Sequence, residues 1–258
     1  MLDWQIDKID AVKVGRSSVL RSRARLFVLR QRSRWHRLTV RSSVQNIPSR
    51  LIRTIPQVTT DEVEQWWKQA CLLHPGWEYV TYREPVDPAL FPLTSPVWPK
   101  CTTGAQKAGL IRLESVWRDG GIYLDSDIEV LRSFLPLTES KMFAAWEDKQ
   151  SVPDAIFGAV AGHPALLDLL DYAIANVELG AWQCGPGAFS KILPGRLDVL
   201  LLPPGSCYPY HYTEQHRASE NFAMTQPWAF CAHHWHGSWQ SDAERAAIAS
   251  RNIDSTTS

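Results

Sequence analysis

Residues 110–134 read LIRLESVWRDGGIYLDSDIEVLRSF and hold the most informative pattern in the chain. Two glycines at 120–121 follow a helix-like segment and precede the short apolar run Ile-Tyr-Leu. Asp125 and Asp127 come directly after it, so two like charges stand where a buried strand is expected to end. In open α/β sheets, ligands bind outside the carboxyl ends of the strands. The stretch therefore predicts either a bound cation at Asp125 and Asp127 or the start of a solvent-exposed loop.

The segments on either side of this stretch alternate between strand and helix patterns. Strands are expected within residues 47–56, 78–84, 141–148, 154–162, 198–204 and 228–235. Helices are expected within 59–77, 104–121 and 164–177, with another starting in 185–193. The first of these has an N-cap candidate in Thr60, and residues 85–99, which contain five prolines, are expected to be a loop. Strands that alternate with helices indicate an α/β fold with a largely parallel sheet.

Length and composition exclude several classes of protein. A chain of 258 residues, 45% hydrophobic, fits one large α/β domain or two small ones. Its five cysteines are odd in number and widely spread, which disfavours a zinc ribbon or a disulfide framework and indicates a reducing compartment. No run approaches the roughly 18 apolar residues of a membrane span, and the first residues do not resemble a secretory signal. We therefore expect a cytoplasmic protein.

The formal net charge of zero conceals an uneven distribution of charge. Residues 1–53 hold 13 Lys and Arg against 3 Asp, whereas the rest of the chain holds 14 basic and 24 acidic side chains. Most of the basic residues are arginines within 16–41. Such a segment could contact nucleic acid or an anionic membrane surface, which would make the protein peripheral at a membrane. A basic helix or tail packed against the acidic remainder of its own chain explains the pattern equally well.

Two adjacent carboxylates raise each other's pKa unless a cation offsets their repulsion. Oxygen ligands suit Mg²⁺ or Mn²⁺, and such an ion would neutralise a diphosphate and stabilise its departure. The competing use of Asp-x-Asp is the haloacid-dehalogenase phosphatase, which usually has Gly directly after the second Asp and Thr or Val one position later. Ile128 and Glu129 occupy these positions here, which disfavours the phosphatase.

The same stretch resembles the DXD region of a glycosyltransferase family, glycosyltransferase family 32. Its best-known members are the Och1-like mannosyltransferases and bacterial capsular-polysaccharide enzymes. Four further stretches resemble the family in the same order: DAIFGAVAGHPALLDLL (154–170), GPGAFSKIL (185–193), LLPPGSCYPY (201–210) and HHWHGSW (233–239). The resemblance covers roughly residues 47–240. It implies a GT-A fold, a Rossmann-like nucleotide-sugar transferase fold with a mixed, mainly parallel sheet, between an arginine-rich segment (1–46) and a C-terminal helix or tail (241–258).

The resemblance also implies roles for residues of the quoted stretch. Asp127 corresponds to the direct metal ligand, and Asp125 to a residue that contacts the ribose and the metal. Arg112 corresponds to an arginine that reaches the donor sugar or its phosphates, a task that suits the fixed fork of a guanidinium. An ion pair from Arg112 to Glu114 or Asp119 is the structural alternative.

The stretch at 233–239 is expected to close the site. By resemblance, His233 or His234 completes the metal shell or touches the diphosphate, while Ser238 and Trp239 meet the phosphate and the leaving group. Three histidines within four residues also suggest zinc, but no thiol or spaced carboxylate joins them in the sequence. Aromatic residues that cap a last strand remain the structural alternative.

The chain departs from the family pattern at several positions. Gly109 stands where relatives often carry an Asp that contacts the donor sugar, and Arg53 and Thr54 replace a His and a Gln of the first strand. Asp154 stands where the family often has Asn, and the resemblance places it at the donor. These departures keep open a sugar-nucleotide-binding or glycan-binding module that retains the fold without turnover.

Other residues near these motifs have more than one reading. Asp154, Glu147 and Asp148 could all face an acceptor, although an exposed surface position is the more common explanation for Glu147 and Asp148. Tyr123 and Leu124 are expected in the core of their strand.

The sequence therefore predicts a metal-dependent, retaining glycosyltransferase. It would move a sugar from a UDP- or GDP-sugar to a hydroxyl of a glycan, lipid-linked or polysaccharide acceptor. Besides the binding module, one alternative is a glycosyltransferase that acts on modified DNA through the basic N-terminal segment.

Overall fold

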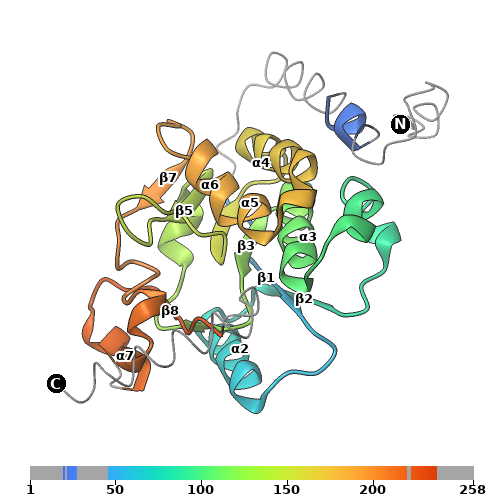
Figure 1. Cartoon of the computed structure of the whole chain (residues 1–258). Coiled ribbons are helices and arrows are strands. Elements are labelled where there is room, and N and C mark those ends of the chain that lie inside the picture. Colours follow the sequence, from blue (N-terminus) through green and yellow to red (C-terminus); the bar gives the residue numbers. More distant parts are fainter. Residues whose placement is uncertain (1–19, 21, 28–45, 220–221, 237–258) are drawn as a thin grey trace.

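The structure, a computed structural model, describes residues 20, 22–27, 46–219 and 222–236 (Figure 1). Its centre is a six-stranded sheet with the strand order β2-β1-β3-β6-β5-β7. The strands are β1 (Arg50–Ile55), β2 (Glu78–Arg83), β3 (Gly121–Leu124), β5 (Met142–Ala145), β6 (Ile156–Ala159) and β7 (Leu200–Leu202). Five of them lie within segments for which the sequence predicts a strand, and β3 begins at Gly121, one residue before the predicted apolar run.

Strand direction agrees with the predicted mixed, mainly parallel sheet. β1 pairs in parallel with both β2 and β3, and β5 pairs in parallel with β7. β6 runs antiparallel to its neighbours β3 and β5. As a result, the start of β6 lies at the same edge of the sheet as the carboxyl end of β3.

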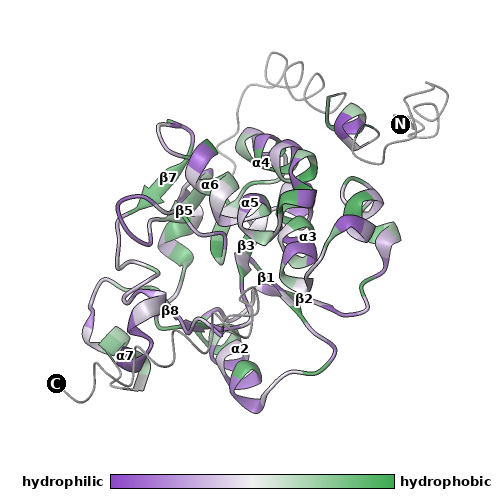
Figure 2. Ribbon diagram, in the orientation of Figure 1, coloured by the Kyte–Doolittle hydropathy of each residue, from purple (hydrophilic) through white to green (hydrophobic). Residues whose placement is uncertain are grey.

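Hydrophobic side chains pack on both faces of this sheet. Ile52, Tyr123 and Phe157 alternate with Leu51, Ile122 and Ile156 along their strands, as the two-residue period of a strand requires. The first three join the core cluster under α3, α4 and α6, and the other three join the cluster beside α2, β4 and β8. The helices on each side turn apolar residues towards the strands, which gives three layers (Figures 1 and 2).

The longer helices begin and end near the residues that the sequence marks, whereas the short helices at 181–184 and 216–219 were not predicted. The longer ones are α2 (Asp61–Leu73), α3 (Gly104–Asp119) and α4 (Pro164–Ala175), followed by α5 (Ala181–Cys184), α6 (Pro186–Ile192) and α7 (His216–Ser219). The Thr60 side chain accepts a hydrogen bond from the Val63 N–H at the start of α2, as predicted for an N-cap. At the end of α3, Gly120 has φ 69°, and a Cβ there would lie 2.8 Å from Pro48. Only glycine fits that turn without strain.

The proline-rich segment 85–99 is more regular than the predicted loop. It contains the 3₁₀ helix η2 (Pro88–Leu90) and most of η3 (Ser95–Lys100). Proline is tolerated in the first turn of each because the N–H that it lacks has no partner there. The remaining 3₁₀ helices are η4 (Leu135–Glu139), η5 (Val177–Leu179), η6 (Tyr212–Glu214) and η7 (Phe222–Thr225).

A separate two-stranded sheet joins the Asp-x-Asp segment to the C-terminal motif. β4 (Ile128–Val130) pairs antiparallel with β8 (Cys231–His233), and Ile128 lies opposite His233. The two motifs are therefore brought together by backbone hydrogen bonds.

The described part of the arginine-rich segment packs against the body of the protein. Residues 22–27 are helical, and Leu26 is buried in the core cluster that contains α4. The Arg23 Nε lies 2.7 Å from Asp171 Oδ1 of α4, and the Arg25 Nη1 donates to the Pro92 carbonyl. These contacts favour packing on its own chain for this portion, whereas most of residues 16–41 and the predicted C-terminal helix (241–258) lie outside the described residues. No helix of the described portion has the length and apolar character needed to cross a bilayer.

Candidate active site

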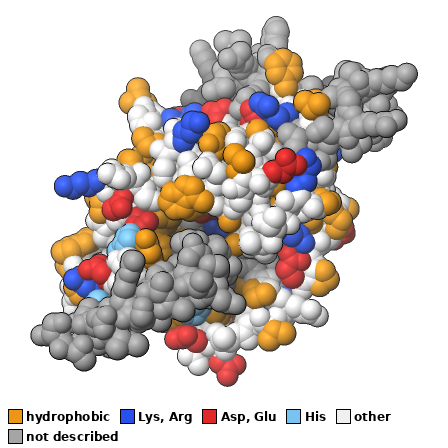
Figure 3. Space-filling model, viewed as in Figure 1, with side chains coloured by type: hydrophobic (Ala, Val, Ile, Leu, Met, Phe, Trp, Pro, Cys, Tyr) orange, Lys and Arg blue, Asp and Glu red, His pale blue; other side chains and the backbone are white. Residues whose placement is uncertain are grey.

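The candidate site is a cavity of about 570 Å³ at the carboxyl end of β3. The Asp125 N–H, directly after β3, donates to the Ala155 carbonyl at 2.8 Å, which fixes the Asp-x-Asp loop against the start of β6. The wall of the cavity includes Thr54, Arg112, Asp125, Asp127, Asp154 and His233. The face drawn in Figure 3 shows acidic and basic side chains interspersed over the surface.

Asp125, Asp127 and His233 form a group that could hold a metal ion. One ligand atom from each lies within 4.8 Å of the other two. The carboxylate side chains are only 25% and 13% exposed, so they face the cavity rather than bulk solvent. The alternative of an exposed loop start does not describe this geometry. Two oxygens and an imidazole nitrogen are a suitable donor set for Mn²⁺ and an acceptable one for Mg²⁺.

Asp127 is held in its ionised form by donors from the C-terminal motif. His233 Nε2 lies 3.1 Å from Asp127 Oδ1, and the His236 N–H donates to Asp127 Oδ2 at 2.9 Å. Burial alone would raise the pKa of Asp127, but His233 and the His236 N–H lower it well below its usual value. In turn, Asp127 raises the pKa of His233 against the opposing effect of burial. A proton on His233 thus supplies positive charge where a metal ion would otherwise lie.

Arg112 binds two carboxylates from different strands. Its Nη2 lies 2.8 Å from Asp125 Oδ1, and its Nη1 lies 3.0 Å from Asp154 Oδ2 and donates to the Asp154 carbonyl at 2.8 Å. Neither Glu114 nor Asp119 is its partner, so the predicted alternative of an ion pair to either of them is wrong. Glu114 instead accepts hydrogen bonds from the backbone N–H groups of residues 93 and 94.

The charges around Asp125 leave it poorly compensated. Burial raises the pKa of Asp125 to about 6, and Asp127 and Asp154 add to this rise, while Arg112 opposes it. Arg112 pairs with Asp125 and Asp154, and Asp127 adds a third carboxylate to the cavity wall, so the site carries an excess of negative charge when His233 is neutral. A divalent cation would balance that excess.

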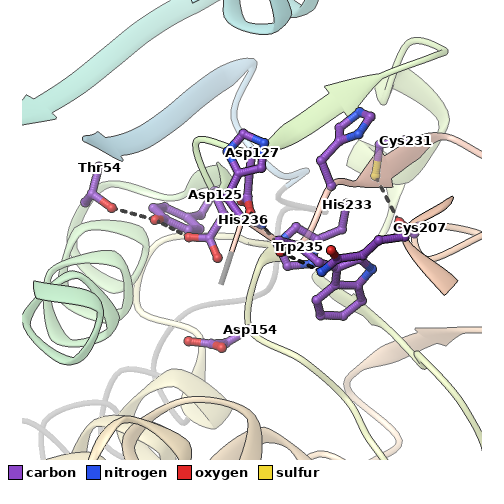
Figure 4. Close-up of polar contacts among 12 residues, drawn as sticks. Thr54, Asp125, Asp127, Asp154, Cys207, Cys231, His233, Trp235 and His236 are labelled. Carbon is purple, nitrogen blue, oxygen red and sulfur yellow. Dashed lines mark hydrogen bonds and ion pairs between the residues drawn. The ribbon is translucent and has the colours of Figure 1, made fainter. Parts of the chain in front are cut away.

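Tyr123 has a role that strand periodicity did not reveal. As predicted, it is a core residue with no exposed surface. Its hydroxyl nevertheless donates to Asp125 Oδ1 at 2.8 Å and lies 2.6 Å from Thr54 Oγ1 (Figure 4). The Arg112 guanidinium lies over the Tyr123 ring, 4.6 Å from its centroid. The Tyr123 hydroxyl, which also contacts Thr54, therefore orients the carboxylate of Asp125 from the side of the core.

The histidines of the C-terminal motif turn to different partners. His233 faces Asp127, whereas His234 Nε2 lies 3.0 Å from Glu129 and its ring stacks on Trp66 at 4.1 Å. The structure therefore brings His233, but not His234, into the group with Asp125 and Asp127. His236 contributes its backbone N–H, so the described residues offer no shared zinc site for the three histidines. Ser238 and Trp239 lie outside the described residues.

Two of the positions that depart from the family pattern have distinct surroundings. A Cβ at Gly109 would meet only Asp154 Oδ2, at 3.9 Å, so packing does not require glycine at this position of the cavity wall. Arg53 is buried on the other face of β1, where its Nη2 lies 2.7 Å from Glu64 and its guanidinium lies over Trp67. It fastens α2 to the sheet rather than lining the cavity.

Glu147 and Asp148, adjacent in the loop after β5, have opposite environments. Asp148 is exposed and accepts hydrogen bonds from the N–H groups of Gln150 and Ser151, as expected for a surface acid in a turn. The Glu147 side chain is only 8% exposed and lines the cavity, so the surface position expected for it is wrong. Burial, with the nearby charge of Asp148, raises the pKa of Glu147 to about 7, although His233 opposes the rise.

This pKa predicts a pH-dependent gain of stability in the Glu147→Gln variant. Because the folded pKa exceeds the ordinary value of 4.5, the native state binds this proton more tightly than the unfolded state. Its contribution to stability is therefore present at low pH and is lost as pH rises through 7. We expect the variant to exceed the wild type by about 1–2 kcal/mol in urea unfolding at pH 8 and to match it near pH 4.5. Glu139→Gln, the same substitution at an exposed position at the end of η4, is the matched control. Equal stabilities of Glu147→Gln and wild type at pH 8 would contradict the prediction.

Comparison with known proteins finds similarity over the central part of the chain. Residues 60–144 match the family model described as a glycosyltransferase sugar-binding region containing a DXD motif. The chain is 27% identical over 124 residues to the alpha-1,4-N-acetylglucosaminyltransferase of Homo sapiens, covering 42% of this chain and 35% of that protein. It is 25% identical over 122 residues to the inositol phosphoceramide mannosyltransferase 3 of Schizosaccharomyces pombe, covering 43% and 33%. The matched parts span about a third of the length of these relatives.

The fold also matches a solved glycosyltransferase structure. The PaToxG glycosyltransferase superposes with a TM-score of 0.50 at 14% identity, over 90% of this chain and 94% of that one. At this level of identity the match shows the fold alone, and it agrees with the predicted GT-A architecture. Over residues 60–144, this chain is therefore similar to the glycosyltransferase sugar-binding regions that contain a DXD motif, and its α/β fold is of the GT-A type.

Proposed function

We propose that this protein is a metal-dependent glycosyltransferase that transfers a sugar from a nucleotide-sugar to an acceptor hydroxyl. The observation that carries the proposal is the convergence of Asp125, Asp127 and His233 in a cavity at the carboxyl end of the sheet. Nucleotides bind at this edge in open α/β sheets. The cavity volume, about 570 Å³, is within the range of small-molecule sites.

Asp125, Asp127 and His233 would hold a Mn²⁺ or Mg²⁺ ion. The residues fit such an ion because Asp125, Asp127 and Asp154 all line the cavity, whereas Arg112 is the one arginine or lysine among the described residues of its wall. When bound, the ion would supply positive charge to the diphosphate of the donor and stabilise it as a leaving group.

Arg112 and Asp154 would orient the donor sugar. Both Nη atoms of Arg112 point at carboxylates of the cavity wall, which fixes the guanidinium plane before any ligand binds. A preorganised cation stabilises developing negative charge without reorganisation during the reaction. Asp154, held by Arg112, offers a carboxylate oxygen to sugar hydroxyls. In this proposal the anomeric configuration is retained, by a same-face path in which the departing diphosphate takes the proton of the acceptor.

The relatives guide the choice of donors and acceptors to test. Their names specify N-acetylglucosamine in one case and mannose with inositol phosphoceramide in the other. We propose a UDP- or GDP-sugar donor and a glycan or lipid-linked acceptor. The intact group of Asp125, Asp127 and Arg112 favours turnover over the alternative of a binding module that has lost activity.

A thermal-shift screen of nucleotide-sugars with Mn²⁺ or with EDTA tests the proposal. A donor that binds only with the metal raises the melting temperature by mass action, by an amount that grows with its concentration. Product formation from that donor is then followed by mass spectrometry. The proposal fails if no UDP- or GDP-sugar shifts the melting temperature with Mn²⁺, or if turnover is the same in EDTA.

His233, the last residue of β8, and His234, which follows it, give a prediction that distinguishes metal binding from packing. We expect His233→Ala to weaken Mn²⁺ binding by about 100-fold, because it removes a donor atom of the group. His234→Ala should leave Mn²⁺ affinity within about threefold but lower the free energy of unfolding by about 1–2 kcal/mol, since it loses the bond to Glu129 and the stack on Trp66. Isothermal titration and urea unfolding measure the two effects. Equal losses of Mn²⁺ affinity in both variants would contradict this assignment.

A further inference from the structure

The β5–β6 hairpin brings two acids to the cavity from matched positions. Ala144 pairs with Phe157, so Glu147 lies three residues after the pair on one strand and Asp154 three residues before it on the other. Both side chains line the cavity. Asp154 is neutralised by Arg112, whereas Glu147 forms no ion pair with an arginine or lysine within the described part of the chain.

The Glu147 carboxyl has a hydrogen-bonding capacity that its own protein leaves unused. Its Oε1 is buried and makes no hydrogen bond among the described residues. The closest ionisable partner of that oxygen is His211 Nε2, at 3.3 Å. Burial lowers the pKa of His211 and raises that of Glu147 to about 7, so burial opposes the charged forms that a full ion pair at this contact would need. A buried oxygen without a partner is costly, by an amount that a bound hydroxyl would recover.

Two further polar atoms near Glu147 are also buried without a hydrogen-bond partner among the described residues. They are Tyr208 Oη and His233 Nδ1. The Tyr208 ring lies 6.0 Å from the His233 ring. Burial and then neighbouring charges, including those of Asp154 and Glu147, raise the pKa of Tyr208, which therefore stays protonated. We call Glu147, Tyr208 and the Nδ1 side of His233 the Glu147 corner.

The Glu147 corner is distinct from the donor side of the cavity. Asp125, Asp127 and the Nε2 side of His233 form the candidate ion site, and Asp154 forms an ion pair with Arg112. Asp148, the other acid of the loop, is exposed and accepts a hydrogen bond from a backbone N–H of its own turn. Among the acids 125, 127, 147, 148 and 154, Glu147 alone is both in the cavity and without a strong partner.

We propose that Glu147 is the acceptor-binding carboxyl group, which accepts a hydrogen bond from a hydroxyl of a sugar acceptor beside the ion site. The inference rests on the proposed glycosyl transfer and adds the acceptor subsite to it. During transfer the acceptor O–H bond breaks and its oxygen bonds to the donor anomeric carbon. The bond from that carbon to the diphosphate breaks with its electron pair, and the diphosphate takes the proton. Glu147 holds the acceptor in position and is unchanged at the end.

The test compares Glu147→Ala and Glu147→Gln with wild type and with Asp148→Asn, all with Mn²⁺. Two quantities are measured for the donor found by the screen: its hydrolysis in water and its transfer to methyl glycosides of glucose, galactose, mannose and N-acetylglucosamine. We expect the ratio of transfer to hydrolysis to fall at least about 30-fold in Glu147→Ala, through a raised KM for the glycoside. Glu147→Gln, which keeps a carbonyl oxygen, should recover part of the ratio, and Asp148→Asn should match wild type.

A binding measurement makes the inference testable apart from turnover. Saturation-transfer NMR with the same four glycosides, the nucleoside diphosphate and diamagnetic Mg²⁺ should show glycoside binding to wild type and its loss in Glu147→Ala. An unchanged transfer ratio, an equal fall of hydrolysis and transfer, or no glycoside binding to wild type would each overturn the role of Glu147. The failure of the proposed function would look different: no nucleotide-sugar would bind to wild type with Mn²⁺.

Discussion

The Asp127→Asn variant is expected to transfer sugar about 1,000-fold more slowly than wild type, or slower still, because the metal supplies several kcal/mol of transition-state stabilisation. Asparagine keeps the shape of the side chain and an oxygen that can accept the His236 N–H, which lies 2.9 Å from Asp127 Oδ2. It removes the negative charge that faces His233. We therefore expect Mn²⁺ affinity to fall together with activity while the fold is retained.

Asp148→Asn is the matched control for this change. Asp148 undergoes the same chemical substitution on the exposed surface, in a turn whose two hydrogen bonds an amide oxygen can also accept. Transfer rates by mass spectrometry and Mn²⁺ binding by isothermal titration are measured on both variants. If Asp127→Asn retained wild-type transfer with the same dependence on Mn²⁺, a metal held at Asp127 would have no part in the reaction.

The second large effect is a loss of stability in the Arg112→Met variant. Methionine fills much of the volume but leaves Asp125 and Asp154 facing each other without their cation. Removing one partner of a buried ion pair costs about 3–5 kcal/mol, because the remaining charge stays buried. The pKa of Asp125, whose rise Arg112 opposes, should then rise further, so the loss should be largest at pH 8 and smaller at pH 5.5, where Asp125 protonates.

Urea unfolding at both pH values measures this loss. Arg118→Met is the control on the same helix, since Arg118 is 36% exposed and pairs with Asp119 at the surface. Its cost should be about 1 kcal/mol or less. Adding Asp154→Asn to Arg112→Met should recover part of the lost stability, because it removes one uncompensated charge. A pH-independent loss, or no recovery in the double variant, would show that Arg112 acts through packing alone.

The order of the elements was predictable because local signals are strong in this sequence. The glycines at 120–121, the apolar run after them and the carboxylates Asp125 and Asp127 place the end of β3 without knowledge of the rest of the fold. Thr60 marks the start of α2 in the same way. Such signals depend on neighbouring residues alone. They also sufficed to predict a mainly parallel sheet.

The partners of the site residues could not be predicted in this way. Arg112 binds Asp154, 42 residues away, because β6 enters the sheet antiparallel beside β3. Glu147 and Asp148 look alike in the sequence, yet tertiary packing buries one and exposes the other. The Tyr123 hydroxyl reaches Asp125 from within the core, where apolar packing is the ordinary expectation. Neighbouring residues of a strand point to opposite faces of its sheet. The different partners of His233 and His234 could therefore have been predicted if the exact last residue of β8 had been known.

The pairing of β4 with β8 also determines when the site can form during synthesis of the chain. All six strands of the main sheet lie between residues 50 and 202, whereas His233 and the His236 N–H that holds Asp127 arrive later along the chain. Ribosomes release a polypeptide from its amino end, so the scaffold can be completed before the ion-binding group exists. A polypeptide truncated near residue 215 would contain all six strands of the main sheet but would lack His233 and the His236 N–H. The ion-binding group would be complete only once residue 236 has been made.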